Sequence, residues 1–566
     1  MIESIAGRTV ANSLVRQHRK AGGSPDDEAV LAELTEALWQ AMLAGDVCLP
    51  LPGQRLVKTL LASPVVARTT GAEKMQPRAL VATEEYLYTY RYWRAEQSLA
   101  SALVGRAATV IDLPVKPADE SFAEQASHNQ RRAVEQALSR KLLVLTGGPG
   151  TGKTFTLAAI VRAAAEQADL MLAGAVTVAP DTDTGAREAL FAVAIAAPTG
   201  KATARLADAI GPTMADRSDV SLEAMTLHRL LGYPGTGRSG VRQHILPFDL
   251  VVVDECSMVD TLMAQRLVGS LAPHARLVLA GDRDQLASVQ AGAFFSALCT
   301  SDALCLAQSR VVLDQNFRQR EAPEIVAWAD AIRLGVLAPD NLPSHQEQVI
   351  FDEGGVTALI DRMTARLQPL VDRASHAAPE QLLQLHADFL QEQTLAMLRS
   401  GPQGVEAINQ QVSRRLNPTL ADAWGSRWYP GRLIVVRRNA AHRDLFNGDI
   451  GLCVALPSEQ GEANDILRVV FPDGNGGVKM ILTSQMPLHA DAWALTVHQA
   501  QGSDFESVLL LPAPRDHPLA TREGLYTALT RARRHIRIYG VPDLLIAAAA
   551  TPVRRISGLP QALRSV

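Results

Sequence analysis

The chain has 566 residues, 47% of them hydrophobic and 20% charged, which predicts three or four domains of a soluble globular protein. Its net charge of −4 excludes a globally basic nucleic-acid-binding protein, so any such site must be a local strip of lysine and arginine. The five scattered cysteines exclude a disulfide framework and a zinc motif, and no segment resembles a signal peptide or membrane span. We therefore expect a cytoplasmic protein.

Residues 1–118 predict a helical N-terminal domain. DEAVLAELTEALWQAMLAG (27–45) has helical periodicity, and LPVKPADES (113–121) has the composition of an interdomain linker. Between them, the alternating tyrosines of YLYTYRYW (86–93) predict a half-exposed strand. The tyrosine face is either part of the core or a contact for a partner, because aromatic side chains concentrate in interfaces.

Strand and helix patterns alternate through the rest of the chain. Short, continuously apolar runs lie between helices, which is typical of a parallel sheet buried on both faces. In residues 119–335 these runs are 141–146, 191–197, 249–255, 276–282 and 310–315, and in residues 336–566 they are 393–400, 507–512 and 535–540. Residues 431–490 instead show short strands separated by NG and DGNGG turns, which predicts a small antiparallel β-barrel inserted in the second domain. The predicted fold class is α/β.

A glycine-rich turn at residues 147–154, GGPGTGKT, follows an apolar strand and precedes a helix. In that context the motif is a P-loop, whose backbone N–H groups surround the phosphates of a nucleoside triphosphate. The lysine side chain reaches the β- and γ-phosphates, and the threonine hydroxyl binds Mg²⁺. The predicted ATP contacts are Gly147, Gly148, Pro149, Gly150, Thr151, Gly152, Lys153 and Thr154.

Gln130 lies upstream in SHNQRRAV (127–134), and two interpretations of it stay open. Its amide can pair with the edge of adenine. Alternatively, Ser127 and Gln130 form the S-x-x-Q pattern of a helix capping box.

Five further polar positions predict hydrolysis. DLVVVDE (249–255) ends in two acids, of which Asp254 is placed to hold the Mg²⁺ bound by Thr154 and Glu255 to activate the attacking water. Gln285, after the next strand, could sense the γ-phosphate. Arg318 in NFRQ and Arg531 in GLYTALTRARR lie far from the P-loop in sequence, and we expect them to supply positive charge to the γ-phosphate from across a domain seam.

The order of these motifs resembles superfamily 1 DNA helicases of the 5′-to-3′ class. The set comprises the P-loop, APTGKATARL (197–206), TLHRLLG (226–232), DECSMVD, GDRDQL, NFRQ, TVHQAQGSDFE (496–506) and YTALTRAR (526–533). The pairing of FNGDIG (446–451) with TVHQAQG narrows the resemblance to the RecD-like enzymes. LRSGPQGVEAIN (398–409), WYPGRLIVVRRN (428–439) and the YLYTYRYW segment resemble the family of the alpha subunit of exodeoxyribonuclease V. One departure is Gln499–Ala500–Gln501, where relatives usually carry Lys-Ser before the glutamine.

The resemblance implies two RecA-like motor domains with single-stranded DNA, entered at a 5′ end, lying across both. The positions that match the family's DNA contacts are Pro198, Thr199, Lys201, Arg205, Thr226, His228, Thr496 and His498. It also implies a heterotrimer with the beta and gamma subunits of exodeoxyribonuclease V, in which the N-terminal domain docks on gamma.

The predicted function is an ATP-dependent 5′-to-3′ DNA helicase motor in a helicase–nuclease that processes double-strand breaks. No carboxylate cluster of the kind a nuclease needs is evident, so we expect that activity in another subunit. Two alternatives stay open: a stand-alone helicase of the RecD-like or Dda-like kind, and a P-loop scaffold that uses ATP only to order an assembly.

Overall fold

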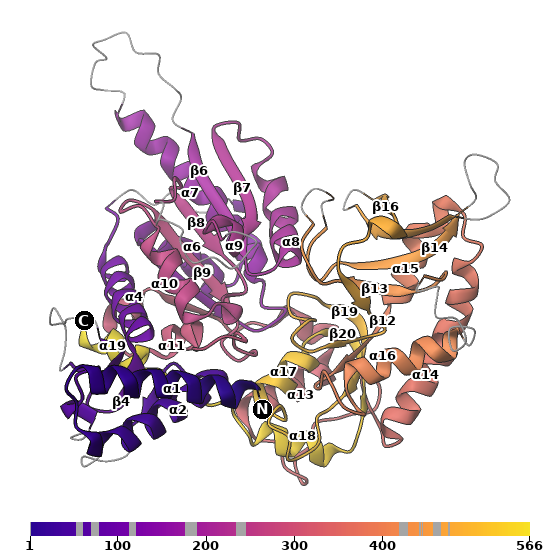
Figure 1. The fold of residues 1–566 in the computed structure, drawn as a ribbon. Coiled ribbons are helices and arrows are strands. Elements are labelled where there is room, and N and C mark those ends of the chain that lie inside the picture. The colour runs from indigo at the N-terminus through magenta and orange to yellow at the C-terminus, as the bar shows by residue number, and fades with distance from the viewer. Residues whose placement is uncertain are drawn as a thin grey trace.

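The computed structural model describes residues 2–51, 60–69, 78–112, 120–175, 190–233, 245–417, 428–440, 443, 445–456, 466–473 and 476–566. Most of the proposed linker, 113–119, lies outside these residues. Two parallel sheets with their helices form the two lobes of Figure 1, and the N-terminal elements pack beneath the first lobe.

The first lobe contains a six-stranded parallel sheet of order β10-β5-β9-β8-β6-β7. Its strands are β5 (Leu142–Gly147), β6 (Phe191–Ala197), β7 (Val220–Thr226), β8 (Leu250–Val253), β9 (Arg276–Gly281) and β10 (Arg310–Leu313). Alternate side chains of β5 enter two separate cores, Leu142 and Val144 on one face and Leu143 and Leu145 on the other. Burial on both faces is why these strands are continuously apolar.

Helices cover both faces of this sheet. One face carries α5 (Glu120–Gln125), α6 (His128–Ser139), α7 (Lys153–Ala175) and α8 (Gly200–Ile210). The other carries α4 (Tyr90–Ala108), α9 (Leu227–Leu230), α10 (Thr261–Gly269), α11 (Phe294–Thr300), α12 (Leu304–Gln308) and α19 (Leu559–Ser565). Both α4 and the C-terminal α19 therefore pack on the first lobe.

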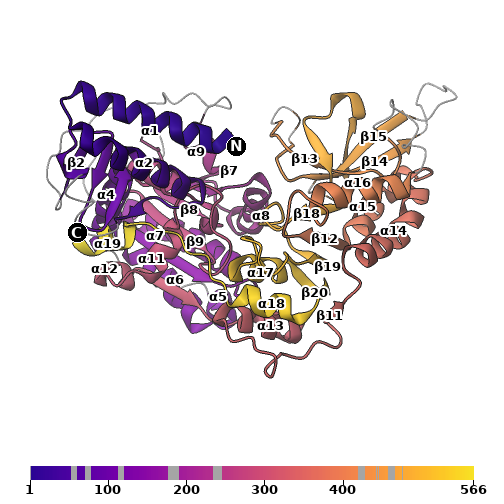
Figure 2. The same ribbon diagram turned by 60° about the horizontal axis from the view of Figure 1, so that its bottom comes forward.

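The second lobe contains a five-stranded parallel sheet of order β11-β20-β19-β12-β18. Its strands are β11 (Val349–Asp352), β12 (Glu392–Ala396), β18 (Ala494–Thr496), β19 (Phe505–Leu511) and β20 (Ala532–Tyr539). The helices around it are α13 (Pro323–Leu334), α14 (Gly355–Ala374), α15 (Leu382–Leu390), α16 (Val405–Leu416), α17 (Arg522–Leu529) and α18 (Pro542–Ala549). Figure 2 shows the two lobes facing each other, with α8 of the first near α17 and β18 of the second.

The segment 431–490 forms an antiparallel sheet of order β16-β15-β14-β13-β17. Its strands are β13 (Leu433–Val436), β14 (Ile450–Leu456), β15 (Ile466–Pro472), β16 (Val478–Leu482) and β17 (His489–Asp491). The predicted antiparallel strands are confirmed. Closure into a barrel is not, because β16 and β17 are the two edges of this sheet among the described residues.

The N-terminal elements are α1 (Ile2–Lys20), α2 (Glu28–Leu43) and a four-stranded sheet of order β1-β4-β3-β2. The sheet's strands are β1 (Leu49–Pro50), β2 (Val66–Arg68), β3 (Leu80–Ala82) and β4 (Tyr86–Thr89). The predicted strand over 86–93 is wrong beyond Thr89, because Tyr90 begins helix α4. Tyr88 is buried, and Tyr86, Tyr90 and Tyr92 pack around the same small core, which supports the interpretation of these tyrosines as core.

The predicted α/β fold class is confirmed by these two parallel sheets. The domain boundaries stay predictions, although α4 and α13 both pack into the lobe that follows them in sequence. Each helix in the described part of the chain is too short or too polar to cross a lipid bilayer.

Candidate ATP site at the seam between the lobes

The P-loop lies where β5 ends and α7 begins, at the carboxyl edge of the first sheet. Gly150 and Gly152 have φ values of +80° and +77°, which favour glycine. A Cβ atom at Gly152 would lie 2.5 Å from the side-chain nitrogen of Gln130, so that position has no room for one. The Lys153 ammonium donates to the carbonyl oxygens of Gly147 at 2.7 Å and Gly148 at 3.1 Å. The lysine side chain therefore lies over the glycine-rich turn.

Gln130 forms the predicted capping box at the start of α6. Its Oε1 accepts the Ser127 N–H at 2.8 Å, and its Nε2 donates to the Thr151 carbonyl at 3.3 Å. Because the side chain is buried and both ends of the amide have protein partners, this geometry favours the capping-box interpretation. The adenine contact stays a prediction that the structure does not support.

The two acids after β8 lie in the same cavity as the P-loop. Asp254 accepts the Glu255 N–H at 2.8 Å. Burial, with the charge of Glu255 second, raises the pKa of Asp254, whereas the nearby Lys153 lowers it. Glu255 is the one non-glycine residue with positive φ, 53°, in the described part of the chain. Such left-handed strain in a non-glycine residue is concentrated at functional sites.

A single cavity brings the P-loop residues 148–154 together with the residues predicted for hydrolysis, whereas the predicted ATP contacts Gln130 and Gly147 do not line it. Besides the P-loop, it is lined by Asp254, Glu255, Gln285 and Arg318 from one lobe and by Asp504 and Arg531 from the other. The predicted seam between Lys153 and Arg531 is therefore present in the geometry of the site.

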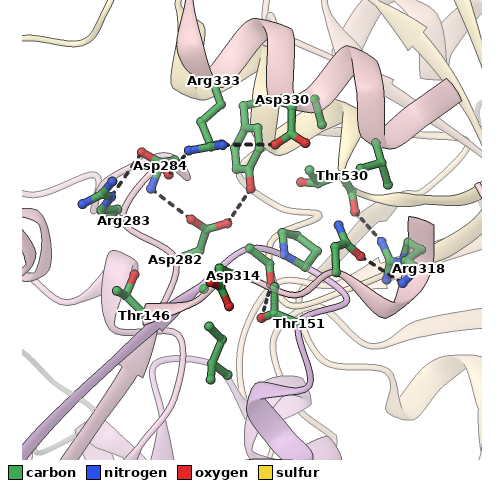
Figure 3. A pocket seen from close by; sticks show the side chains of 18 of the residues that line it. Thr146, Thr151, Asp282, Arg283, Asp284, Asp314, Arg318, Asp330, Arg333 and Thr530 are labelled. Carbon is green, nitrogen blue, oxygen red and sulfur yellow. Dashed lines mark hydrogen bonds and ion pairs between the residues drawn. The ribbon is translucent and has the colours of Figure 1, made fainter. Parts of the chain in front are cut away.

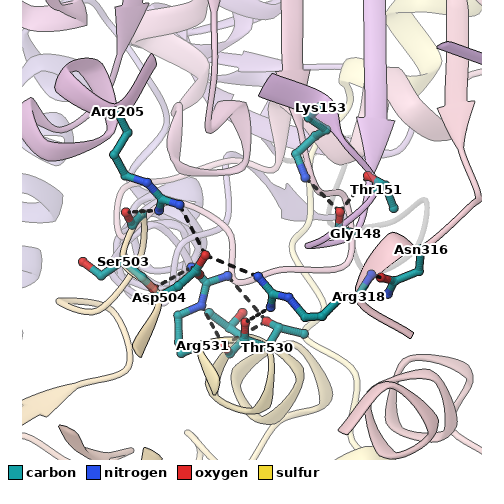
Figure 4. Close-up of polar contacts among 12 residues, drawn as sticks. Gly148, Thr151, Lys153, Arg205, Asn316, Arg318, Ser503, Asp504, Thr530 and Arg531 are labelled. Atoms are coloured by element: carbon teal, nitrogen blue, oxygen red, sulfur yellow. Dashed lines mark hydrogen bonds and ion pairs between the residues drawn. The ribbon is translucent and has the colours of Figure 1, made fainter. Parts of the chain in front are cut away.

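Asp504 was not among the predicted residues, yet it joins three arginines at this seam (Figure 4). Its carboxylate lies 3.3 Å from Arg205, 3.4 Å from Arg318 and 3.7 Å from Arg531. Arg531 also donates to the carbonyls of Thr527 and Ser503, each at 3.2 Å. The predicted finger arginine is thus held on the cavity wall by the second lobe.

Asn316 and Phe317 tie Arg318 to the P-loop. The Phe317 N–H donates to the Gly150 carbonyl at 2.9 Å, and the Asn316 side chain accepts the Arg318 N–H at 2.9 Å. A second cavity on this side of the P-loop is lined by Asp282, Asp314, Arg333 and their neighbours (Figure 3). Asn316 and Phe317 were not predicted as site residues, but both lie inside the NFRQ motif, which could have identified them.

The predicted DNA contacts are divided between the two lobes. Three threonines among them accept local backbone N–H groups, at 3.2 Å for Thr199, 3.4 Å for Thr226 and 3.2 Å for Thr496. Thr199 and Thr226 thereby cap the starts of α8 and α9. Each hydroxyl keeps its own proton for another acceptor. The exposed His228 packs edge-to-face against the ring of Tyr233, 5.4 Å away.

The two cations on α8 both lie near the seam, although the Arg205 side chain is 47% exposed. Arg205 donates to the Gly502 carbonyl at 2.9 Å, in addition to its ion pair with Asp504. The Lys201 ammonium lies 5.8 Å from the centre of the Phe505 ring, and burial lowers its pKa. Pro198 and His498 are half-buried, and burial also lowers the pKa of His498. The role of all eight residues in DNA binding stays a prediction.

Comparison with known proteins decides the family. The model of an AAA domain matches residues 125–351, and that of a UvrD-like helicase C-terminal domain matches residues 491–539. The RecBCD enzyme subunit RecD of Mycobacterium tuberculosis is 34% identical, over 98% of this chain and 95% of that protein. The chain belongs to the RecD family. The predicted resemblance is confirmed.

Two further proteins match this chain over different shares of their own lengths. The ATP-dependent RecD2 DNA helicase of Deinococcus radiodurans is 29% identical, over 80% of this chain but only 54% of that protein. A crystal structure of the Pif1 helicase from Candida albicans is 16% identical with a TM-score of 0.41, and the match covers 76% of this chain and 97% of that one.

Proposed function

We propose that this RecD-family chain is an ATP-dependent DNA helicase motor, which moves 5′ to 3′ on single-stranded DNA within a helicase–nuclease that processes double-strand breaks. The observation that carries the proposal is the shared cavity, because Lys153 from one lobe and Arg531 from the other line it together. Because hydrolysis needs both residues, its rate depends on how the two lobes are placed relative to each other. Such a site can convert ATP turnover into opening and closing of the seam.

The ATP site fits its nucleotide and Mg²⁺ on chemical grounds. The P-loop presents converging N–H groups at the start of α7, whose positive end favours phosphate. Asp254 and the Thr154 hydroxyl line the same cavity, and a buried carboxylate whose pKa is raised suits a divalent cation. When bound, Mg²⁺ would neutralise charge on the β- and γ-phosphates. Glu255 is then the residue placed to accept a proton from the attacking water.

The assembly context rests on the relatives. The M. tuberculosis protein, named as a RecBCD subunit, matches nearly end to end, whereas the RecD2 helicase extends well beyond the match. We therefore assign beta and gamma subunits of exodeoxyribonuclease V as partners, and residues 1–118 as the docking domain. The motor domains are 119–335 and 336–566, with the insert at 431–490. We place single-stranded DNA on the eight predicted contacts, which are Pro198, Thr199, Lys201, Arg205, Thr226, His228, Thr496 and His498.

The test of the motor is Lys153→Gln in the full chain. ATP hydrolysis measured as phosphate release with single-stranded DNA should fall at least about 100-fold, because the lysine no longer stabilises charge on the transferring phosphate. Lys141→Gln is the matched control, since that lysine lies just before the same strand and donates to the Pro273 carbonyl, away from the P-loop. Normal turnover in Lys153→Gln would exclude the ATP-site assignment.

Co-purification from the native host tests the context. Recovery of this chain with two partner subunits and a DNA-stimulated ATPase would support the subunit. A chain that unwinds DNA and has no partner would be a stand-alone helicase, and a partner-bound chain without hydrolysis would be a scaffold.

A further inference from the structure

The side chain of Gln285 has a defined orientation in the ATP cavity. It is only 5% exposed, and its Nε2 donates to Oδ2 of Asp282 at 3.3 Å. Because Asp282 accepts this hydrogen bond, the NH₂ end of the amide faces the carboxyl group. The opposite end, Oε1, has no hydrogen-bond partner in the described structure. A buried amide oxygen without a partner is unusual, and here it belongs to a residue that lines the cavity.

Asp282 is in turn held by two other donors, one of them from the second lobe. Its Oδ1 accepts the Asp284 N–H at 3.0 Å, and its Oδ2 accepts the hydroxyl of Tyr526 on α17 at 3.0 Å (Figure 3). Burial raises the pKa of Tyr526, so the hydroxyl keeps the proton that it donates. The contact is reinforced next to it, where the Leu286 N–H donates to the Thr527 hydroxyl at 2.9 Å.

We infer that Asp282 and Tyr526 are positioning residues, which hold the Gln285 amide with its oxygen toward the water that attacks the γ-phosphate. This rests on the proposed function and specifies the role of Gln285: it accepts a hydrogen bond from the water instead of donating one to the phosphate. Because Tyr526 belongs to the second lobe, the orientation depends on the contact between the lobes. Hydrolysis is thereby linked to the arrangement of the seam through Gln285 as well as through Arg531.

The test is Tyr526→Phe in the full chain, assayed for ATP hydrolysis with saturating single-stranded DNA. We expect kcat to fall about ten-fold and KM for ATP to change less than two-fold, because one hydrogen bond to a charged group is lost while the phosphate contacts remain. Tyr539→Phe is the matched control. Its hydroxyl is buried in the second lobe and has no hydrogen-bond partner among the residues that the structure describes, so its removal should leave kcat unchanged.

A double-mutant cycle separates positioning from general damage to the fold. In a Gln285→Ala background, Tyr526→Phe should lower kcat less than two-fold further, because the amide that it orients is gone. Full kcat in Tyr526→Phe, a raised KM with unchanged kcat, or an undiminished effect in the Gln285→Ala background would each overturn the inference. If the parent chain showed no DNA-stimulated hydrolysis, the proposed function itself would fail, and the two failures are therefore distinguishable.

Discussion

Asp504 lies among three guanidinium groups that belong to separate elements of the fold. Arg205 is on α8, Arg318 on the 3-10 turn Phe317–Arg320, and Arg531 directly after α17. Burial raises the pKa of Asp504, but the charges of Arg531, Arg205 and Arg318 outweigh it, and the net shift is downward. Without this carboxylate, three cations would share one small volume. Asp504 is therefore the counter-charge that allows the arginines to approach across the seam.

Asp504→Asn should weaken both the seam and catalysis. The substitution keeps the shape and removes the charge, so we expect kcat for ATP to fall at least about ten-fold and the free energy of unfolding to fall by about 2 kcal/mol. Asp361→Asn is the control, because Asp361 pairs with Arg415 on the exposed surface, where an ion pair contributes little. Unchanged turnover in Asp504→Asn, measured beside this control, would contradict the role given to the carboxylate.

At the scale of elements, the start of α6 is joined to the P-loop by one side chain. Gln130 completes the capping box with Ser127 and also donates to the Thr151 carbonyl. The same amide thus stabilises a helix end and a turn 21 residues away in sequence. Two residues outside the P-loop therefore bind its backbone carbonyls: Gln130 of α6 at Thr151 and Phe317 at Gly150.

Two substitutions separate these contributions. Ser127→Ala removes only the cap, and we expect it to cost about 1 kcal/mol of stability with KM for ATP unchanged. Gln130→Ala also frees the Thr151 carbonyl, so it should cost about 2 kcal/mol and raise KM for ATP several-fold. Chemical denaturation and steady-state ATPase assays measure the two effects. Equal KM values in both variants would show that the contact with Thr151 does not order the P-loop.

Helices and strands could be predicted from the sequence where one periodicity of apolar residues dominates a segment. Eight strands of the two parallel sheets were found from their short apolar runs, which burial on both faces favours: β5, β6, β8, β9, β10, β12, β19 and β20. The edge strands β11 and β18 of the second sheet were missed. Strand β7 was missed because it is a half-exposed edge strand with mixed polarity. The strand predicted over 86–93 ends at Thr89, because buried residues at helical spacing, from Ala95 to Ala107, extend α4 back to Tyr90.

In the candidate site, the residues of short local motifs were predicted, whereas the contacts between residues distant in sequence were not. The P-loop and the acids after β8 were predicted because each is a short motif next to its strand. The contact of Asp282 with Tyr526 joins residues 244 apart, and that of Arg205 with Asp504 joins residues 299 apart. No periodicity encodes such pairs, so they become visible only when the lobes are packed together. All four residues nevertheless lie inside the helicase-like motifs of the sequence, and those motifs could have identified them as candidates.

At the scale of the whole molecule, the C-terminal segment 552–566 returns from the second lobe to the N-terminal region. In Figure 1 the yellow helix α19 lies beside α4, away from the other yellow elements. On the way, the Val47 N–H donates to the Ile556 carbonyl at 2.8 Å. Arg555 donates to the carbonyls of Gly45 at 3.2 Å and Gln290 at 2.7 Å. The segment therefore joins both lobes to the N-terminal elements, and it contacts the loop that follows Gln285.

A buried carboxylate fastens this segment. Glu96 on α4 accepts hydrogen bonds from the Tyr88 hydroxyl at 3.1 Å, the Gly558 N–H at 3.1 Å and the Ser557 hydroxyl. Burial raises the pKa of Glu96 to about 7, although these hydrogen bonds oppose the shift. The protonated acid is thus favoured in the folded state. Between the ordinary pKa of 4.5 and about 7, the folded state binds more protons than the unfolded state, so stability falls as pH rises through that range.

Glu96→Gln should remove this pH dependence. The shift corresponds to about 3 kcal/mol lost between pH 4.5 and pH 8, and the amide carries no charge to desolvate. Hydrogen exchange of the Val47 and Gly558 amides reports local opening of the segment in a multidomain chain. After correction for intrinsic rates, protection in the parent should fall from pH 5 to pH 8 and stay nearly constant in Glu96→Gln. Glu85→Gln, on the exposed turn before β4, should follow the parent. Parallel slopes in the parent and Glu96→Gln would mean that another group sets the pH dependence of this junction.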